Sequence, residues 1–255
     1  MKKGLYILPS LFTLGNIAGG VYSIINSING RFPDAAAAIF VSLVFDILDG
    51  RIARMTKSVS KFGVELDSLA DLTSFGIAPA ILMYQFVLNH YNNLGGVIAF
   101  CYIIAAAIRL ARFNVKVDEG APSEYFLGLP VPGAAGILAA FVLSYNMFAQ
   151  DIKARAIPVI VNTMPIMSNF IWAGMLILSY LMVSNIHYTS FKKMKLGKAK
   201  PLRYLIFLTV FGMLLWLYPE NMILIVFVMY ILSGLFDVFA RLSRWSKLRR
   251  MGDKK

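Results

Sequence analysis

Hydrophobic residues occur along this chain in long stretches that short polar breaks separate. A stretch of about 20 residues is long enough for a helix that crosses the hydrocarbon core of a bilayer. The breaks carry turn residues and helix-ending residues such as Asn29-Gly30, Asn92-Asn93 and Pro219. The pattern predicts an all-α, polytopic membrane helix bundle with about eight transmembrane helices, or seven if the short seventh stretch is re-entrant. We expect these helices over 7–28, 34–55, 63–89, 95–114, 129–149, 159–187, 203–218 and 220–242.

Basic residues are distributed unevenly over the predicted loops. With the N-terminus inside, the outer breaks hold only Arg31, Lys153 and Arg155, and the inner segments with the adjoining helix ends hold most of the other Lys and Arg residues. Positive charge is typical of the cytoplasmic side, so we expect both termini to lie there, in the cell (inner) membrane. Two basic clusters, over 192–203 and 241–255, adjoin apolar stretches. They therefore fit an anionic lipid surface better than nucleic acid.

Composition supports a membrane protein. The 255 residues are 58% hydrophobic, and a mean hydropathy of +0.69 excludes an ordinary soluble domain. The formal net charge is +12, with 25 basic and 13 acidic residues. The single cysteine, Cys101, excludes an intramolecular disulfide.

Acidic residues are concentrated in one short segment. Five of the 13 lie between Asp46 and Asp71, and this segment joins two apolar stretches. Carboxylates at membrane depth are costly and by default mark function. Coordination of hard divalent cations through oxygen would offset the cost of keeping them together. The segment therefore predicts a metal site at the edge of the bilayer.

The spacing of four aspartates predicts that they converge. Asp46 and Asp49 are three residues apart, and Asp67 and Asp71 are four apart. On a helix, such pairs lie on one face, one turn apart. Two antiparallel helices joined through the polar link 55–62 would turn the two pairs toward each other. Four converging carboxylates would repel strongly without a cation.

A structural ion-pair network is the alternative explanation. The aspartates would then pair with the neighbouring basic residues Arg51, Arg54, Lys57 and Lys61. Ion pairing does not require small residues at positions 50, 53 and 63, whereas a site that brings phosphates against the backbone does.

The segment also matches a known signature at fixed spacing. Its eight specified residues are Asp46, Asp49, Gly50, Ala53, Arg54, Gly63, Asp67 and Asp71. Together they resemble the complete signature of the CDP-alcohol phosphotransferase family. The resemblance implies an integral membrane enzyme that displaces CMP from a CDP-linked substrate by attack of an alcohol hydroxyl.

The same resemblance implies roles for the residues. The four aspartates would hold divalent metal, Asp71 would also serve as general base, and Gly50, Ala53, Arg54 and Gly63 would line the CDP pocket. Oxygen ligands favour Mg²⁺ or Mn²⁺, and we expect two ions. Thr56 and Ser60 can equally bind the diphosphate or ribose or cap the loop.

Three further strings resemble the members of this family that use serine as the acceptor. They are Ser74-Phe75-Gly76, Arg109-Leu-Ala-Arg112-Phe113-Asn114 and residues 125–136. The resemblance implies CDP-diacylglycerol and L-serine as substrates. Arg109 and Arg112 can bind a carboxylate through bidentate contacts, and Asn114 can accept from an ammonium. The same arginines can instead bind the donor phosphates, pair with nearby acids, or simply follow the positive-inside pattern.

Other functions remain open at this stage. Glycerol 3-phosphate and inositol phosphate are alternative acceptors for the same chemistry, and a cation transporter is an alternative of another class. A transporter usually shows internal repeats, and none is visible here. We expect residues 1–187 to form the catalytic helices, 188–202 a basic cytoplasmic loop, and 203–255 two C-terminal transmembrane helices with a basic tail. Homodimerisation, common in the family, is a further expectation.

Overall fold

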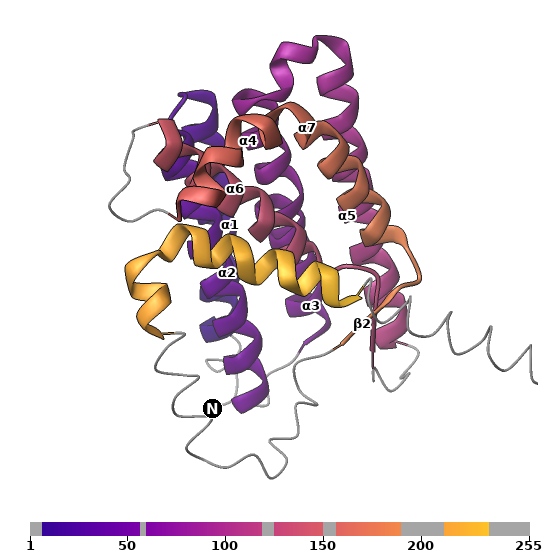
Figure 1. Ribbon diagram of the computed structural model, residues 1–255. Helices are drawn as coiled ribbons and strands as arrows, with labels where there is room; N and C mark the ends of the chain where they lie inside the picture. Colours follow the sequence, from indigo (N-terminus) through magenta and orange to yellow (C-terminus); the bar gives the residue numbers. More distant parts are fainter. Residues whose placement is uncertain (1–6, 57–59, 119–124, 150–156, 190–211, 235–255) are drawn as a thin grey trace, which may run out of the picture.

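The computed structural model describes residues 7–56, 60–118, 125–149, 157–189 and 212–234. These residues form a bundle of helices with one small pair of strands (Figure 1). The helices are α1 (Ile7–Ile28), α2 (Phe32–Met55), α3 (Lys61–Asp71), η2 (Leu72–Ile77), α4 (Ala78–Phe86), η3 (Leu88–Tyr91), α5 (Asn93–Asp118), α6 (Val131–Ala149) and α7 (Pro158–Val183). Helical residues 212–217 and Pro219–Gly234 follow.

Within the described residues, five helices are long and apolar enough to cross a membrane. They cover Ser10–Ile28, Lys61–Phe86, Asn93–Val115, Val131–Ala149 and Pro158–Val183. Helix α2 is of similar length, but its C-terminal half carries two aspartates and two arginines. The first six predicted helices are therefore confirmed as helices, with bounds shifted by a few residues. The total of eight spans stays a prediction, because 203–211 and 235–242 lie outside the described residues.

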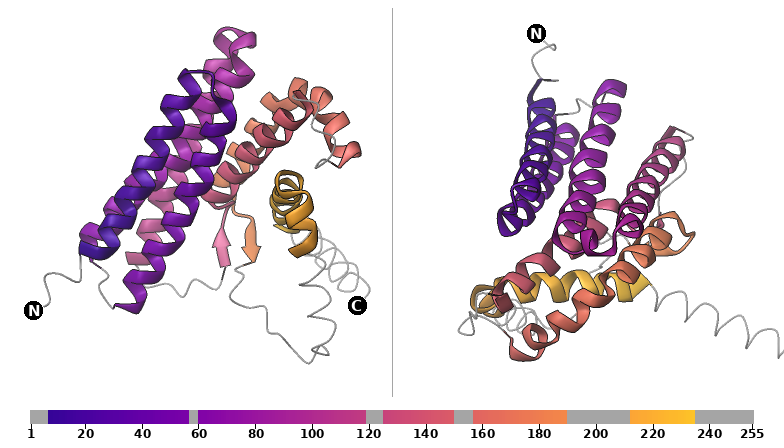
Figure 2. Two further views of the ribbon diagram at one scale, coloured as in Figure 1. Left: turned by 90° about the vertical axis from the view of Figure 1, so that its left-hand side faces the viewer. Right: turned by 90° about the horizontal axis from the view of Figure 1, so that it is seen from above.

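Helices α1 and α2 form the most extensive helix pair of the fold (Figure 2). Two consecutive glycines on α1 allow close approach to its neighbours. A Cβ at Gly19 would collide with the hydroxyl of Ser42 on α2, and one at Gly20 would lie 2.8 Å from Cα of Ser74. Small residues at such contacts are typical of membrane helix interfaces. Helix α1 is thus packed against both segments that carry the aspartates.

The third predicted helix contains a π-helical segment in its middle. Helix α3 ends at Asp71, the π-helical turns of η2 follow, and α4 continues as an α-helix from Ala78. Ser74, Phe75 and Gly76 of η2 are buried, and the hydroxyl of Tyr102 on α5 donates to the main-chain oxygen of Phe75 at 3.3 Å. Segments of this kind frequently lie at functional sites. Here the segment begins directly after the last signature aspartate.

The predicted all-α fold is confirmed, with one short pair of strands added to it. Strands β1 (Tyr125–Leu127) and β2 (His187–Thr189) form an antiparallel pair at the end of α7. After β1, Gly128 has φ +77°, and its amide donates to the oxygen of Ile186 at 2.8 Å. The predicted sixth helix, 159–187, therefore ends at Val183 instead, and β2 takes up the first residues of the predicted loop 188–202.

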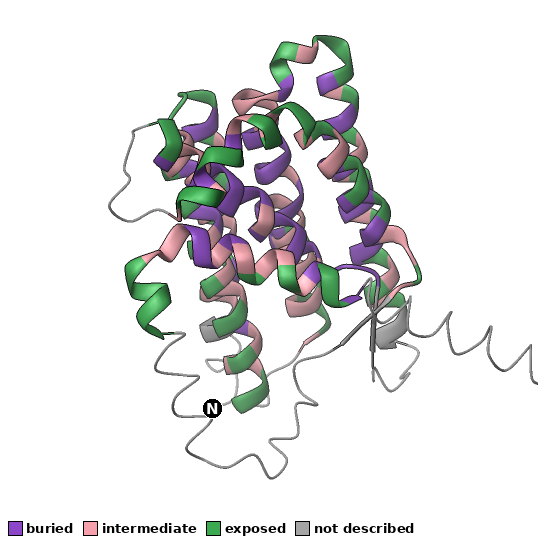
Figure 3. Cartoon of the chain, viewed as in Figure 1, coloured by how far each residue is buried: buried purple, intermediate pink, exposed green. Residues whose placement is uncertain are grey.

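Buried residues form a central core that α2, η2, α4, α5, α6 and α7 share, and exposed apolar residues cover the outside of the bundle (Figure 3). The helix Pro219–Gly234 packs on α6. A Cβ at Gly133 would lie 3.3 Å from the Tyr230 ring, and one at Gly136 would collide with Phe227. This helix crosses the front of α2 in Figure 1. Its Phe227 ring also lies 6.2 Å from the ring of Phe40 on α2, measured between ring centroids, so this helix packs on both α6 and α2.

Candidate active site

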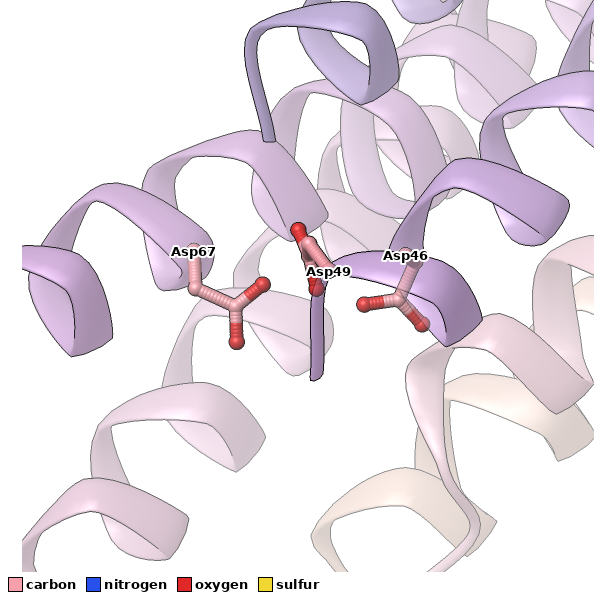
Figure 4. Close-up of side chains that lie close together, drawn as sticks. All are labelled: Asp46, Asp49 and Asp67. Atoms are coloured by element: carbon pink, nitrogen blue, oxygen red, sulfur yellow. The ribbon is translucent and has the colours of Figure 1, made fainter. Parts of the chain in front are cut away.

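Three of the four signature aspartates form one cluster. Asp46, Asp49 and Asp67 each offer a carboxylate oxygen, and these oxygens all lie within 4.8 Å of one another. Asp49 lies between Asp46 and Asp67, and the three carboxylates point toward one common space (Figure 4). Asp46 and Asp49 come from α2, and Asp67 comes from α3. The structure thus brings the first predicted pair, Asp46 and Asp49, together with Asp67 of the second pair.

Asp71 lies next to this cluster. Its carboxyl group lies close enough to that of Asp46 to interact with it electrostatically. The amide nitrogen of Asn16, from α1, lies 3.5 Å from Oδ1 of Asp71. Asp71 also interacts electrostatically with the buried guanidinium of Arg109 on α5. The fourth aspartate is therefore held where α1, α2 and α5 meet α3.

The donor set of this cluster fits a hard divalent cation. Its ligand atoms are carboxylate oxygens only, which favour Mg²⁺ or Mn²⁺ over soft metals. Among the described residues, buried Oδ2 of Asp49 and Oδ1 of Asp67 have no hydrogen-bond partner. A buried charged oxygen without a partner is costly, and coordination of a cation removes that cost.

The small signature residues leave space beside the cluster. At Gly50, an added Cβ would meet only the Arg54 guanidinium, at 3.7 Å and 3.8 Å. Arg54 itself is exposed, and Ala53 and Gly63 are half-buried. The open space at Gly50 and the guanidinium one turn away are compatible with an anionic group lying against α2.

Thr56 and Ser60 both serve as local caps. Oγ of Ser60 accepts from the amide of Gly63 at 3.0 Å and so caps the start of α3. Oγ1 of Thr56 donates to the main-chain oxygen of Ile52 at 2.8 Å at the end of α2. The capping alternative is therefore observed for both residues, and contact with CDP stays a prediction.

The three predicted acceptor residues point to different neighbours. Arg109 is buried, lies 5.4 Å from the ring centroid of Phe113, and faces Asp71. The guanidinium of Arg112 donates to the oxygen of Val183 and to Oδ1 of Asn185, at the end of α7. Asn114 donates to Ser68 on α3. Arg109 thus interacts with a signature aspartate, and the roles of all three residues stay predictions.

Three residues at the site were not predicted. Thr13 of α1 makes a side-chain hydrogen bond to Asp49, and Asn16 contacts Asp71. Both are buried, and a spacing of three residues puts them on one face of α1. Their polarity within an apolar stretch was a usable signal. Tyr230, which interacts with Arg109 from the C-terminal helix, had no such signal, because many aromatic residues occur in these helices.

Comparison with known sequences agrees with this geometry. Residues 6–178 match the sequence profile of the family described as CDP-alcohol phosphatidyltransferase. The chain belongs to that family. The matched range contains all four aspartates, and the CDP-alcohol phosphatidyltransferase signature therefore coincides with the carboxylate cluster.

Several relatives within the CDP-alcohol phosphatidyltransferase family carry the name CDP-diacylglycerol–serine O-phosphatidyltransferase. One from Helicobacter pylori is 35% identical over 231 residues, which cover 91% of this chain and 90% of the relative. One from Bacillus subtilis is 33% identical over 186 residues, which cover 73% of this chain and 92% of the relative. One from Methanocaldococcus jannaschii is 43% identical over 110 residues, 43% of this chain and 51% of the relative.

Proposed function

We propose that this protein transfers the phosphatidyl group of CDP-diacylglycerol to the hydroxyl of L-serine, with release of CMP. The observation that carries the proposal is the similarity to the Helicobacter pylori CDP-diacylglycerol–serine O-phosphatidyltransferase. This similarity extends over nearly the whole of both chains. The complete aspartate signature and its convergence in space support the chemistry.

The donor is a diphosphate whose negative charge repels an incoming hydroxyl. Asp46, Asp49, Asp67 and Asp71 would hold divalent metal, which would neutralise that charge and stabilise the leaving group. Arg54 contributes a further positive charge beside Gly50, where the small side chain lets the diphosphate approach α2. These residues bind and orient the donor, and the lipid chains remain in the bilayer.

The acceptor hydroxyl must lose its proton as it attacks phosphorus. We assign Asp71 as the general base, because it lies at the edge of the cluster that is shared with α1 and α5. A carboxylate within hydrogen-bond reach of the hydroxyl takes the proton in the transition state. The bond from the serine oxygen to phosphorus forms, the bond from phosphorus to the CMP oxygen breaks, and the proton passes to Asp71.

The serine carboxylate needs a cation close to Asp71. Arg109 meets this requirement: its side chain is buried, interacts electrostatically with Asp71 and comes from α5, outside the metal-binding segment. A buried arginine binds a carboxylate with good geometry through its planar fork. Arg109 is therefore the acceptor arginine in our proposal, and Asn114 and Arg112 are candidates for secondary contacts.

We further propose that the site faces the cytoplasm of the cell membrane, with eight spans and both termini inside. The basic loops support this orientation. It can be measured with Lys61→Cys in a Cys101→Ala background, since Lys61 is exposed at the start of α3. A membrane-impermeant thiol reagent should label this cysteine in inverted vesicles and not in intact cells; the reverse pattern contradicts the orientation.

The deciding experiment measures CMP release by purified protein with CDP-diacylglycerol and Mn²⁺. The acceptor panel contains L-serine, inositol, inositol phosphate, glycerol 3-phosphate and water. We expect CMP release when L-serine is the acceptor and no release with the other members of the panel. The lipid product should be phosphatidylserine. CMP release with another acceptor would support the transfer reaction but refute serine as the acceptor. No CMP release with any acceptor would refute both the transfer reaction and the serine assignment. Asp67→Asn, prepared in parallel, controls for a contaminating activity.

A further inference from the structure

Asn16 is a buried polar residue at the centre of a membrane helix. Its side chain is fully buried, and Nδ2 lies 3.5 Å from Oδ1 of Asp71, at the long end of hydrogen-bond distances. Its own Oδ1 has no hydrogen-bond partner among the described residues. A buried amide costs free energy unless its groups are bonded. A purely apolar residue at this position would avoid that cost, so the position of the amide beside Asp71 needs an explanation.

The backbone of Asn16 is fixed by both segments that carry the aspartates. Its main-chain oxygen accepts from Oγ of Ser42 on α2 at 3.1 Å and from Oγ of Ser74 on η2 at 2.8 Å. Gly19 and Gly20, one turn further along α1, leave the space that these two hydroxyls occupy. Residue 16 is therefore placed relative to the carboxylates by two direct hydrogen bonds as well as by general packing.

These contacts close a ring between α1 and the segment around Asp71. The side chain of Asn16 meets Asp71, and three residues further along the chain Ser74 donates to the main-chain oxygen of Asn16. Asp71 is the last residue of α3, and Ser74 lies in the π-helical segment that follows directly. One residue of α1 thus contacts both the aspartate and the segment that follows it.

A second asparagine of α1 offers an internal comparison. Asn26 is also fully buried, and its Oδ1 also has no partner among the described residues. Its Nδ2, however, donates to the oxygen of Tyr22 in its own helix at 2.8 Å. It lies ten residues from Asn16, or about 15 Å along a helix. Asn26 is therefore a matched control with a local structural role.

We infer that Asn16 is a positioning residue for Asp71. Its amide nitrogen fixes one carboxylate oxygen, so that the other oxygen is directed at the hydroxyl of the acceptor. The inference rests on the proposed function, because that function assigns Asp71 as general base. Loss of such orientation should reduce turnover by about 10- to 100-fold, because small displacements of reacting groups have effects of this size.

The test compares Asn16→Leu and Asn16→Asp with Asn26→Leu in the purified full-length protein. The leucine variant keeps the approximate size, and the aspartate variant keeps an oxygen and loses the donating amide. We expect kcat to fall in both Asn16 variants, with little change in the KM values for CDP-diacylglycerol and serine. Asn26→Leu should keep the wild-type kcat per folded molecule. If Asn16→Leu fails to insert into the membrane, Asn16→Ser replaces it.

The other outcomes are distinguishable. Full kcat in Asn16→Asp would overturn the inference, because it would show that the oxygen of Asn16 matters and the amide does not. Equal losses in Asn16→Leu and Asn26→Leu would also overturn it, in favour of a structural role. Failure of the wild-type protein to use serine instead contradicts the proposed function, and full turnover of Asp71→Asn contradicts the base assignment alone.

Discussion

Oγ of Ser68 accepts a hydrogen bond from Nδ2 of Asn114 at 2.9 Å, and Ser68 directly follows Asp67 in α3. The contact joins the end of α5 to the helix that carries the last two aspartates. We expect Ser68→Ala and Asn114→Ala each to raise the Mn²⁺ concentration needed for half-maximal activity several-fold, because the supports of metal ligands affect metal affinity. A rise in the KM for serine in Asn114→Ala alone would instead favour binding of the serine ammonium.

Replacement of Arg109 should change the KM for serine, whereas replacement of Arg112 should chiefly change stability. Arg109→Lys should raise the KM for serine, since one ammonium does not reproduce the planar fork. A loss of about 1.5–3 kcal/mol corresponds to roughly ten- to a hundred-fold in kcat/KM. A rise in the KM for CDP-diacylglycerol instead would place Arg109 on the donor phosphates.

Arg112→Lys should chiefly lower stability. The Arg112 guanidinium donates to Val183 and Asn185 at the end of α7, and loss of such a bond costs about 1 kcal/mol. A thermal unfolding experiment in detergent measures this effect. An unchanged melting temperature together with a raised KM for serine would show that Arg112 leaves these partners to bind the acceptor.

Removal of one charged ligand should abolish activity. Asp46→Asn and Asp67→Asn each replace a carboxylate of the cluster by a neutral amide, and we expect activity to fall by several orders of magnitude. EDTA should abolish wild-type activity, and added Mg²⁺ or Mn²⁺ should restore it. Wild-type turnover that persists in EDTA would contradict the metal assignment.

The free space at Gly50 gives a prediction for donor binding. A Cβ there meets only the Arg54 side chain, so Gly50→Leu should fold and yet occupy the space beside α2. We expect a loss of CDP-diacylglycerol affinity with an unchanged melting temperature. Normal donor affinity in this variant would place the nucleotide elsewhere.

Gly20 and Gly174 form a matched pair for the helix contacts. A Cβ at Gly20 would lie 2.8 Å from Cα of Ser74, whereas one at Gly174 in α7 would meet nothing within 4 Å. Gly20→Ala should therefore destabilise the protein by about 1–3 kcal/mol. Gly174→Ala should be neutral or stabilising by up to about 1 kcal/mol. Thermal unfolding of both variants checks the difference, and equal melting temperatures would contradict the close contact.

Local spacing explains why the carboxylate cluster could be predicted. Asp46 with Asp49, and Asp67 with Asp71, lie on helix faces that the sequence specifies directly. The positions of Thr13 and Asn16 depend on which face of α1 packs against α2 and η2, which is a long-range property. Arg109 and Arg112 contact different neighbours, and this difference likewise depends on where α7 ends. That end is set by contacts of β2 and Gly128 that form only in the folded chain.

The main-chain oxygen of Asn16 accepts hydrogen bonds from both Ser42 and Ser74, and this has a consequence for how the protein is assembled in the membrane. Helix α1 leaves the ribosome before α2 and η2, so it reaches the bilayer before Ser42 and Ser74 can donate to it. Thr13 and Asn16 then lack the aspartate partners that they contact in the folded protein. Although α1 is apolar enough to cross a membrane, these two polar side chains make it a less favourable membrane segment on its own. We therefore expect the buried polar groups of α1 to gain these partners only after the chain has been synthesised through residue 74.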